Sequence, residues 1–153
     1  GVRKDIKTFP YRELDHELVK KYPLKIFGKH NLLNLSAAMT ALEQIGVKKD
    51  DFLKAIQSFK GASKRLELIA ESPTQAFYTD FAHSPSKLKA TVEAMKNQFT
   101  NRKLTAVMEL HTFSSLKKDF LPQYMNCMDG ADVNLVYFSP EVVAHKKLEA
   151  IKP

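Results

Sequence analysis

The sequence predicts an α/β protein with a mostly parallel sheet, and two observations carry this prediction. After residue 60, segments typical of strands alternate with amphipathic segments typical of helices. Alternation of this kind implies parallel strands joined by right-handed crossovers. Before residue 61, apolar residues recur every three or four positions, which predicts helices instead. We therefore expect two parts, residues 1–60 and 61–153, joined at the small residues Gly61-Ala62-Ser63.

The first part is expected to contain one short strand and an antiparallel pair of helices. The strand candidate is Leu24–Phe27, which is followed by Gly28. One helix should begin at Asn31 and end before Gly46, and the next should begin with Asp50 as its N-cap. The apolar residues that this second helix should bury are Phe52, Leu53, Ile56 and Phe59.

The second part is expected to alternate strands and helices. The strand candidates are residues 66–69, 76–79, 103–110 and 133–138. The helix candidates are residues 85–99, 119–128 and 140–148, and Ser84 and Pro85 suit the start of the first of them. Doubly wound sheets usually have about five or six strands. We therefore expect a small sheet or a truncated chain.

The composition is that of a soluble globular protein, with 44% hydrophobic and 27% charged residues. The sequence has no apolar run of the roughly 18 residues that a membrane span needs, and no signal peptide is recognisable. The single cysteine, Cys127, fits a reducing compartment and lies between Met125 and Met128, so we expect it to pack in the core. These features favour a cytoplasmic protein without a membrane partner.

The net charge of +7 is unevenly distributed along the chain. Residues 1–30 carry eight Lys or Arg and four Asp or Glu, and the rest of the chain is closer to neutral. No long basic helix with interleaved aromatic residues occurs. A surface for anionic substrates such as nucleotides is therefore favoured over a nucleic-acid interface.

Polar residues follow the predicted strands at the sheet edge where α/β proteins bind ligands. Asp80 and His83 follow the strand that ends near residue 79, and Ser139 follows the last strand. The loop after residue 110 contains His111, Thr112, Ser114 and Ser115. Ordinary capping of loops and helix starts explains these residues about as well as a binding site does.

Three further residues suit a nucleotide but also have simpler explanations. Asn31 and Asn34 offer the donor and acceptor that the edge of adenine requires, although they would also cap a helix. Arg65 could bind a phosphate or form a weak surface ion pair. The Gly-rich phosphate loop GxxxxGK(S/T) does not occur in the chain.

Three motifs resemble those of the Mur ligase family, in the order and at the spacing of that family. Residues 28–38, GKHNLLNLSAA, resemble its GxHNxxNxxAA segment. Residues 59–67, FKGASKRLE, resemble its FxGxxxRxE segment, and residues 80–85, DFAHSP, resemble D(Y/F)AHxP. The resemblance covers about residues 24–110. It implies that residues 1–60 end the central ATPase domain and that residues 61–153 form most of the Rossmann-like C-terminal domain.

The resemblance also implies roles for individual residues. Asn31 and Asn34 would hold the adenine of ATP, Arg65 would reach its phosphates and Asp80 would bind its ribose. His30 and His83 would organise their loops rather than transfer protons. The residues that would face the incoming peptide are His111, Thr112, Ser114 and Ser115. No catalytic residue and no metal ligand is expected within the chain.

The reaction implied by the family is ATP- and Mg²⁺-dependent amide formation through an acyl phosphate. DFAH and the segment ELHTFSS are most similar to the murein peptide ligase branch, which joins UDP-N-acetylmuramate to L-alanyl-γ-D-glutamyl-meso-diaminopimelate in peptidoglycan recycling. The branch that adds L-alanine is the alternative. In the relatives considered, an arginine near this loop grips the peptide carboxylate. Here His111 and Thr112 stand instead, and histidine does not reproduce a bidentate clamp.

The resemblance leaves several parts of the enzyme outside this sequence. The family's phosphate loop, carbamylated lysine and magnesium ligands would precede residue 1. Without its remaining domains, the chain is therefore expected to be inactive. The compartment that the resemblance implies is a bacterial cytoplasm. A non-catalytic nucleotide-binding module and a folylpolyglutamate-synthase-like ligase remain alternatives. The basic nucleic-acid binder is the least favoured class.

Overall fold

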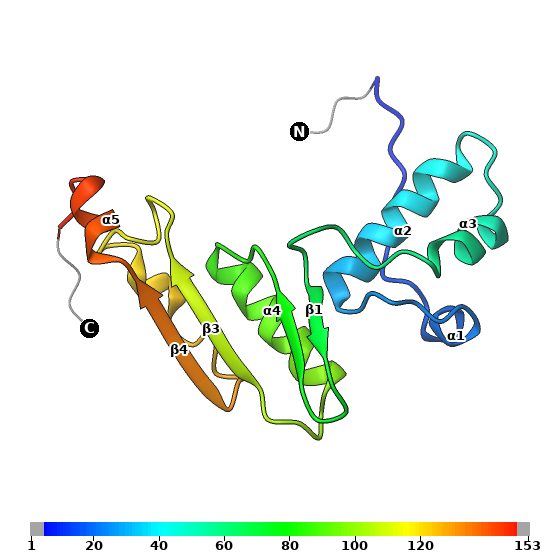
Figure 1. Cartoon of the computed structure of the whole chain (residues 1–153). Helices are drawn as coiled ribbons and strands as arrows, with labels where there is room; N and C mark the ends of the chain where they lie inside the picture. Colours follow the sequence, from blue (N-terminus) through cyan, green and yellow to red (C-terminus); the bar gives the residue numbers. More distant parts are fainter. Residues whose placement is uncertain (1–4, 150–153) are drawn as a thin grey trace. The chain divides into compact units, whose positions relative to one another are not determined.

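The computed structural model describes residues 5–149, apart from the side chain of His16, and Figure 1 shows its elements. The chain forms two compact units, Gly1–Gly61 and Ala62–Pro153. None of the helices in the described residues is long and apolar enough to cross a membrane.

The first unit contains three helices. Helix α1 is His16–Lys21, α2 is Lys29–Glu43 and α3 is Lys49–Ile56. Their apolar faces share one core because each helix can bury only one side. The buried residues of this core are Leu14, Tyr22, Leu35, Met39, Phe52 and Leu53.

The expected strand at residues 24–27 is wrong, because this segment has no regular secondary structure. The described residues of the first unit contain no strand with which this segment could pair. Leu24 and Ile26 pack against the helical core instead.

The two main helices of this unit begin earlier than predicted. Gly28 is the N-cap of α2 and has a φ of 89°, a conformation that favours glycine. Lys48 rather than Asp50 is the N-cap of α3. Asp50 lies in the first turn of α3 and accepts a hydrogen bond of 2.7 Å from the Tyr22 hydroxyl. Phe59, which we expected to be buried, is 41% exposed because it follows the last turn of α3.

The second unit is an α/β arrangement, as predicted. Strands β1, Glu67–Glu71, and β2, Ala76–Thr79, form an antiparallel hairpin. Strands β3, Thr105–Leu110, and β4, Val133–Phe138, are parallel, as Figure 1 shows. Parallel pairing within the described part of the chain is confined to β3 and β4, and the hairpin forms a separate sheet.

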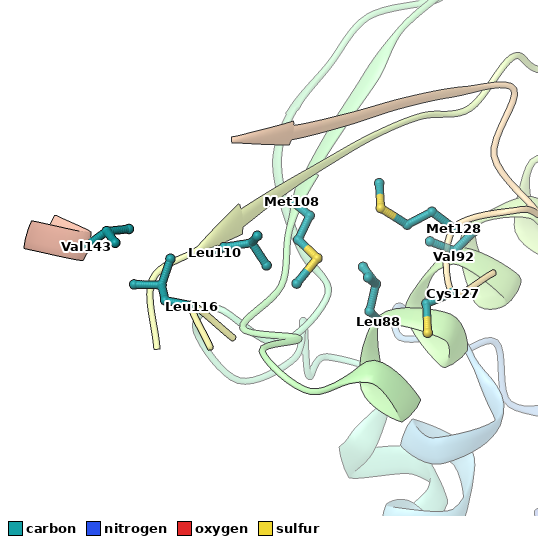
Figure 2. Packing of buried hydrophobic residues seen from close by; sticks show 8 residues of the cluster. All are labelled: Leu88, Val92, Met108, Leu110, Leu116, Cys127, Met128 and Val143. Atoms are coloured by element: carbon teal, nitrogen blue, oxygen red, sulfur yellow. The ribbon is translucent and has the colours of Figure 1, made fainter. Parts of the chain in front are cut away.

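One core joins the helices of the second unit to β3. It includes α4, Pro85–Gln98, whose N-cap is Ser84, and α5, Pro140–His145. Figure 2 shows Met108 of β3 facing Leu88 of α4. The buried members of the core are Leu88, Val92, Met108, Leu110, Leu116, Cys127, Met128 and Val143. The Cys127 thiol therefore packs in the core, as predicted.

The helix expected at residues 119–128 is wrong. Only a short 3-10 helix, η1, Leu121–Tyr124, forms there, and turns follow it. Asn126 has a φ of 63°, which is incompatible with a continuous right-handed helix. Cys127 and Met128 are buried, as the amphipathic pattern predicted, but they lie in turns rather than in a helix.

Strand β3 buries one of its faces, whereas β4 is exposed on both faces apart from the half-buried Phe138. Alternation along β3 directs Met108 and Leu110 into the core, whereas Val107 is 69% exposed. The register places Val107 beside Leu135, which is 53% exposed. We call Val107, Val133, Leu135 and Tyr137 the outer apolar face.

Asp132 ties the end of α4 to the start of β3. One of its carboxylate oxygens accepts hydrogen bonds from Lys96 Nζ at 2.6 Å and from the Leu104 amide at 2.8 Å. The hydrogen bond from the Lys96 ammonium, followed by that from the Leu104 amide, lowers the pKa of Asp132 below its usual value. The carboxylate thereby fixes the position at which β3 begins.

Candidate functional site

The aromatic ring of Phe81 is the meeting point of three segments of the second unit. The His83 ring lies 4.7 Å from it and the His111 ring lies 5.8 Å from it, between ring centroids. The guanidinium carbon of Arg65 lies 6.0 Å from the centre of the same ring. The loops after β2 and β3 are therefore brought together, as the sequence predicts, and Arg65 joins them.

Asp80 directly precedes Phe81 in the chain, and its two carboxylate oxygens accept hydrogen bonds from different donors. Oδ1 accepts from the Leu66 amide at 3.3 Å, and Oδ2 accepts from the Thr91 hydroxyl. The carboxylate thus connects the end of β2 with residue 66 and with α4. An ionised carboxylate has about four lone-pair positions, so both oxygens retain room for further donors.

Arg65 stands in an unusual turn. Lys64 and Leu66, its two neighbours, have φ values of 54° and 48°. This left-handed conformation costs a non-glycine residue about 1–2 kcal/mol, and it persists only where the surroundings impose it. The Phe81 amide donates to the Lys64 carbonyl at 2.9 Å, which is one such constraint. The Arg65 side chain itself is exposed and available to an anionic ligand.

The hydrogen bonds of His83 are those of a residue that shapes its loop. Its ring Nδ1 and its amide lie 3.1 Å and 3.0 Å from the Phe81 carbonyl. Since a carbonyl only accepts, this geometry favours a proton on Nδ1. The His83 carbonyl in turn accepts from the Tyr124 hydroxyl at 2.7 Å.

The loop after β3 is closed by its own side chains. The Ser115 amide donates to Thr112 Oγ1 at 3.0 Å, and the Thr112 amide donates to Ser115 Oγ at 3.0 Å. Ser115 is only 2% exposed, so its hydroxyl maintains the loop and is not presented at the surface. Ser114 is exposed and His111 is half-buried, so both are more accessible than Ser115.

The third loop has a simpler structural role. Ser139 accepts a hydrogen bond from the Val142 amide at 3.4 Å and caps α5.

The amide and imidazole groups of the first unit lie at the start of α2. Asn31 and Asn34 are one turn apart, which places them on one side of the helix. Asn31 is not the cap of the helix, because Gly28 is the N-cap, and the Asn31 Nδ2 donates to the Phe27 carbonyl at 2.8 Å. Asn34 is exposed. His30 is half-buried in the same turn.

Residues 5–149, as far as they are described, contain no group of three or more His, Cys, Asp or Glu that could hold an ion.

Residues 64–152 match the family model described as "Mur ligase, glutamate ligase domain". The chain belongs to the Mur ligase family. The matched segment begins next to Arg65 and contains all of the loops that meet at Phe81. Family membership therefore rests on the unit that carries this cluster.

Curated relatives with the name UDP-N-acetylmuramate–L-alanine ligase match more of the chain. The protein from Caldicellulosiruptor bescii is 33% identical over 84% of this chain and 28% of its own length. The protein from Desulfitobacterium hafniense is 31% identical over 73% of this chain and 25% of its own length. The chain thus spans about a quarter of the length of these Mur ligases.

A solved structure of another Mur ligase confirms the fold of this chain. The UDP-N-acetylmuramate–alanine ligase from Thermotoga maritima superposes with a TM-score of 0.65 at 21% sequence identity. The match covers 81% of this chain and 27% of that protein. It establishes the shared α/β fold.

Sequence reasoning missed several residues around the cluster. Phe81 lies inside a recognised motif, but its role as a shared contact was not predicted. Thr91 and Tyr124 lie 11 and 41 residues from their partners Asp80 and His83. No local pattern marks such pairs, because the fold alone brings them together.

Proposed function

We propose that this chain forms part of an ATP-dependent ligase that joins an amine to the carboxyl group of UDP-N-acetylmuramate. The observation that carries the proposal is the convergence of Arg65, His83 and His111 on Phe81, beside Asp80, in a chain of the Mur ligase family. The names of the curated relatives support the sugar nucleotide as the carboxyl substrate. A bacterial cytoplasm is the compartment that such substrates imply.

In this proposal four polar side chains contact ATP. Asn31 and Asn34 hold the adenine edge through their amides. Arg65 contacts the phosphates through its guanidinium, which can donate two parallel hydrogen bonds. Asp80 accepts from the ribose hydroxyls while its bonds to Leu66 and Thr91 hold it in place. His30 and His83 organise the two loops.

The proposed reaction transfers the terminal phosphoryl group of ATP to the UDP-muramyl carboxylate and gives an acyl phosphate. The amine attacks the acyl carbon, and the tetrahedral intermediate releases phosphate and leaves an amide. Arg65 would stabilise the charge on the transferring phosphoryl oxygens by electrostatic attraction. The Mg²⁺ that such a reaction uses would draw its protein ligands mainly from residues outside this chain.

The incoming amine would meet the loop after β3, where His111, Thr112 and Ser114 are the candidate contacts. Ser115 would act indirectly by keeping that loop closed. The resemblance of DFAH and ELHTFSS to the murein peptide ligase branch favours the murein tripeptide as the amine, whereas the curated relatives are named for L-alanine. The loop from His111 to Leu116 contains no arginine to clamp a second carboxylate, which supports the smaller amine.

Phosphate release by the full-length ligase tests this proposal. The assay supplies ATP, Mg²⁺ and UDP-N-acetylmuramate with either L-alanine or the tripeptide. Phosphate release that requires UDP-N-acetylmuramate and one of the amines is expected, and the preferred amine identifies the branch. Replacement of Arg65 by Ala should lower kcat/KM for ATP by a factor that corresponds to roughly 2–3 kcal/mol.

Arg12→Ala is the matched control, because Arg12 is an exposed arginine outside the cluster. It should leave the ATP kinetics unchanged. Amine-independent turnover, or equal kinetics for the Arg65 and Arg12 variants, would contradict the proposal. ATP binding without any turnover would favour a non-catalytic nucleotide-binding module.

A further inference from the structure

Glu67 is the last residue of the motif at 59–67, and neither the resemblance nor the proposed ATP contacts give it a task. It is the first residue of β1 and is half-buried. Its carboxylate oxygen Oε2 accepts the Lys64 amide at 2.7 Å and the Ser63 hydroxyl at 3.3 Å. Both donors precede Arg65 in the chain, so the carboxylate folds back across the turn that carries this arginine.

The turn needs such support because of its backbone. Lys64 and Leu66 both adopt positive φ, and neither is glycine. Conformations of this kind persist only when surrounding contacts impose them. Glu67 constrains the amide of Lys64, and Asp80 constrains the amide of Leu66 from the other side. The two carboxylates thus hold the residues on either side of Arg65.

The orientation of Arg65 depends on these two residues. Its guanidinium carbon lies 6.0 Å from the Phe81 ring centre, and the Phe81 amide donates to the Lys64 carbonyl at 2.9 Å. The peptide groups of Lys64 are therefore bound at both ends, the amide by Glu67 and the carbonyl by Phe81. If the amide were released, the turn could relax and Arg65 could leave the ring.

We propose that Glu67 is a positioning residue that holds the Arg65 turn in the geometry needed to contact the phosphates of ATP. This inference rests on the proposed function for the role of Arg65. Glu67 itself contacts no substrate and acts through the turn. A carboxylate is suited to this task because a charged acceptor binds a backbone amide more strongly than a neutral one.

Isothermal titration of the full-length ligase with ATP, together with kcat and KM measurements, tests the inference. Glu67→Ala should weaken ATP binding about tenfold, the loss that corresponds to one hydrogen bond to a charged group, mainly as a higher KM. Glu67→Gln keeps an oxygen acceptor at the same reach and should retain most of the affinity. Glu71→Ala, at the exposed other end of β1, is the matched control and should bind like the wild type.

The decisive measurement is the double variant of Glu67→Ala and Arg65→Ala. If Glu67 acts through Arg65, the Glu67 change should cause no further loss of ATP affinity once Arg65 is absent. Equal losses with and without Arg65 would show a general structural role and overturn the inference. Wild-type affinity in Glu67→Ala would overturn it as well.

Hydrogen exchange of the Lys64 amide separates this inference from the proposed function. Exchange should be faster in Glu67→Ala than in the wild type, whether or not ATP binds. If neither the wild type nor Arg65→Ala binds ATP, the proposed function fails, and the exchange rate still reports on the turn. Unchanged exchange in Glu67→Ala would overturn the positioning role.

Discussion

The hydroxyl of Tyr124 donates a hydrogen bond of 2.7 Å to the backbone carbonyl of His83. This bond joins η1 to the loop that follows β2. The ring of Phe120 packs edge-on against Tyr124 at a centroid distance of 5.9 Å and so supports it from another side. The loop that presents Asp80 and Phe81 is therefore anchored to the part of the second unit that follows β3.

Removal of this hydroxyl in Tyr124→Phe should loosen the loop while the ring remains packed. We expect the free energy of unfolding to fall by about 1 kcal/mol, the usual value of one hydrogen bond. The His83 amide should also exchange faster with solvent. Denaturant titration and hydrogen exchange measure the two effects. Tyr137→Phe, in which the ring is 58% exposed, is the control, and equal results for both variants would contradict the anchoring role.

Asp132 predicts a pH dependence of stability. The hydrogen bond from Lys96, followed by that from the Leu104 amide, lowers the pKa of this carboxyl in the folded state. Its contribution is therefore present above the unfolded value near 3.8 and is lost as the pH falls below that value toward the folded pKa. Unfolding midpoints between neutral and acidic pH should fall more steeply in the wild type than in Asp132→Asn.

Asp129→Asn is the control for the acid experiment, because Asp129 is an exposed carboxylate in the same connection. Its midpoints should follow those of the wild type at every pH. A parallel decline in Asp132→Asn and the wild type would show that the Lys96 contact contributes nothing measurable.

Leu116 should be among the residues on which stability depends most. Its side chain is fully buried, at 0% exposure, within the core of the second unit. Leu116→Ala should cost about 2–5 kcal/mol, since it removes apolar contacts and leaves a cavity. Leu135→Ala, at a side chain that is 53% exposed, should cost much less. Thermal and denaturant unfolding distinguish the two, and similar losses would contradict the assigned core.

Asp80→Asn tests the proposed ribose contact. Asparagine preserves the size of the side chain but loses one acceptor oxygen, so KM for ATP should rise roughly tenfold. Thr91→Val removes the donor to the same carboxylate and leaves the charge in place. It should change stability more than KM. Wild-type ATP kinetics in Asp80→Asn would exclude the ribose role.

The parts of the fold that could be predicted have strong local signals. The strands predicted at residues 76–79 and 133–138 have the same bounds in the structure, as β2 and β4. Helix α4 has proline at its first position and an apolar stripe along its length. In each case the packing in the structure agrees with the local signal.

The wrong predictions arose where tertiary structure decides. Residues 24–27 have strand propensity, but a strand needs a partner, and this segment packs on helices instead. Residues 119–128 have a helical apolar pattern, yet only η1 forms there, and the positive φ of Asn126 prevents a continuous α-helix. The loops around Phe81 were predicted to converge, whereas the bonds of Asp80 to Leu66 and Thr91 could not be read from spacing.

The outer apolar face of the β3–β4 pair has a practical consequence for handling this chain. The segment Val133-Asn134-Leu135-Val136-Tyr137-Phe138 carries no charge and is rich in residues that favour strands. Uncovered strands of this composition template further strands and lead to aggregation. The chain produced alone should therefore precipitate as its concentration rises. Lysine at position 135 should raise its solubility without disturbing Met108 and Leu110, which face the opposite side.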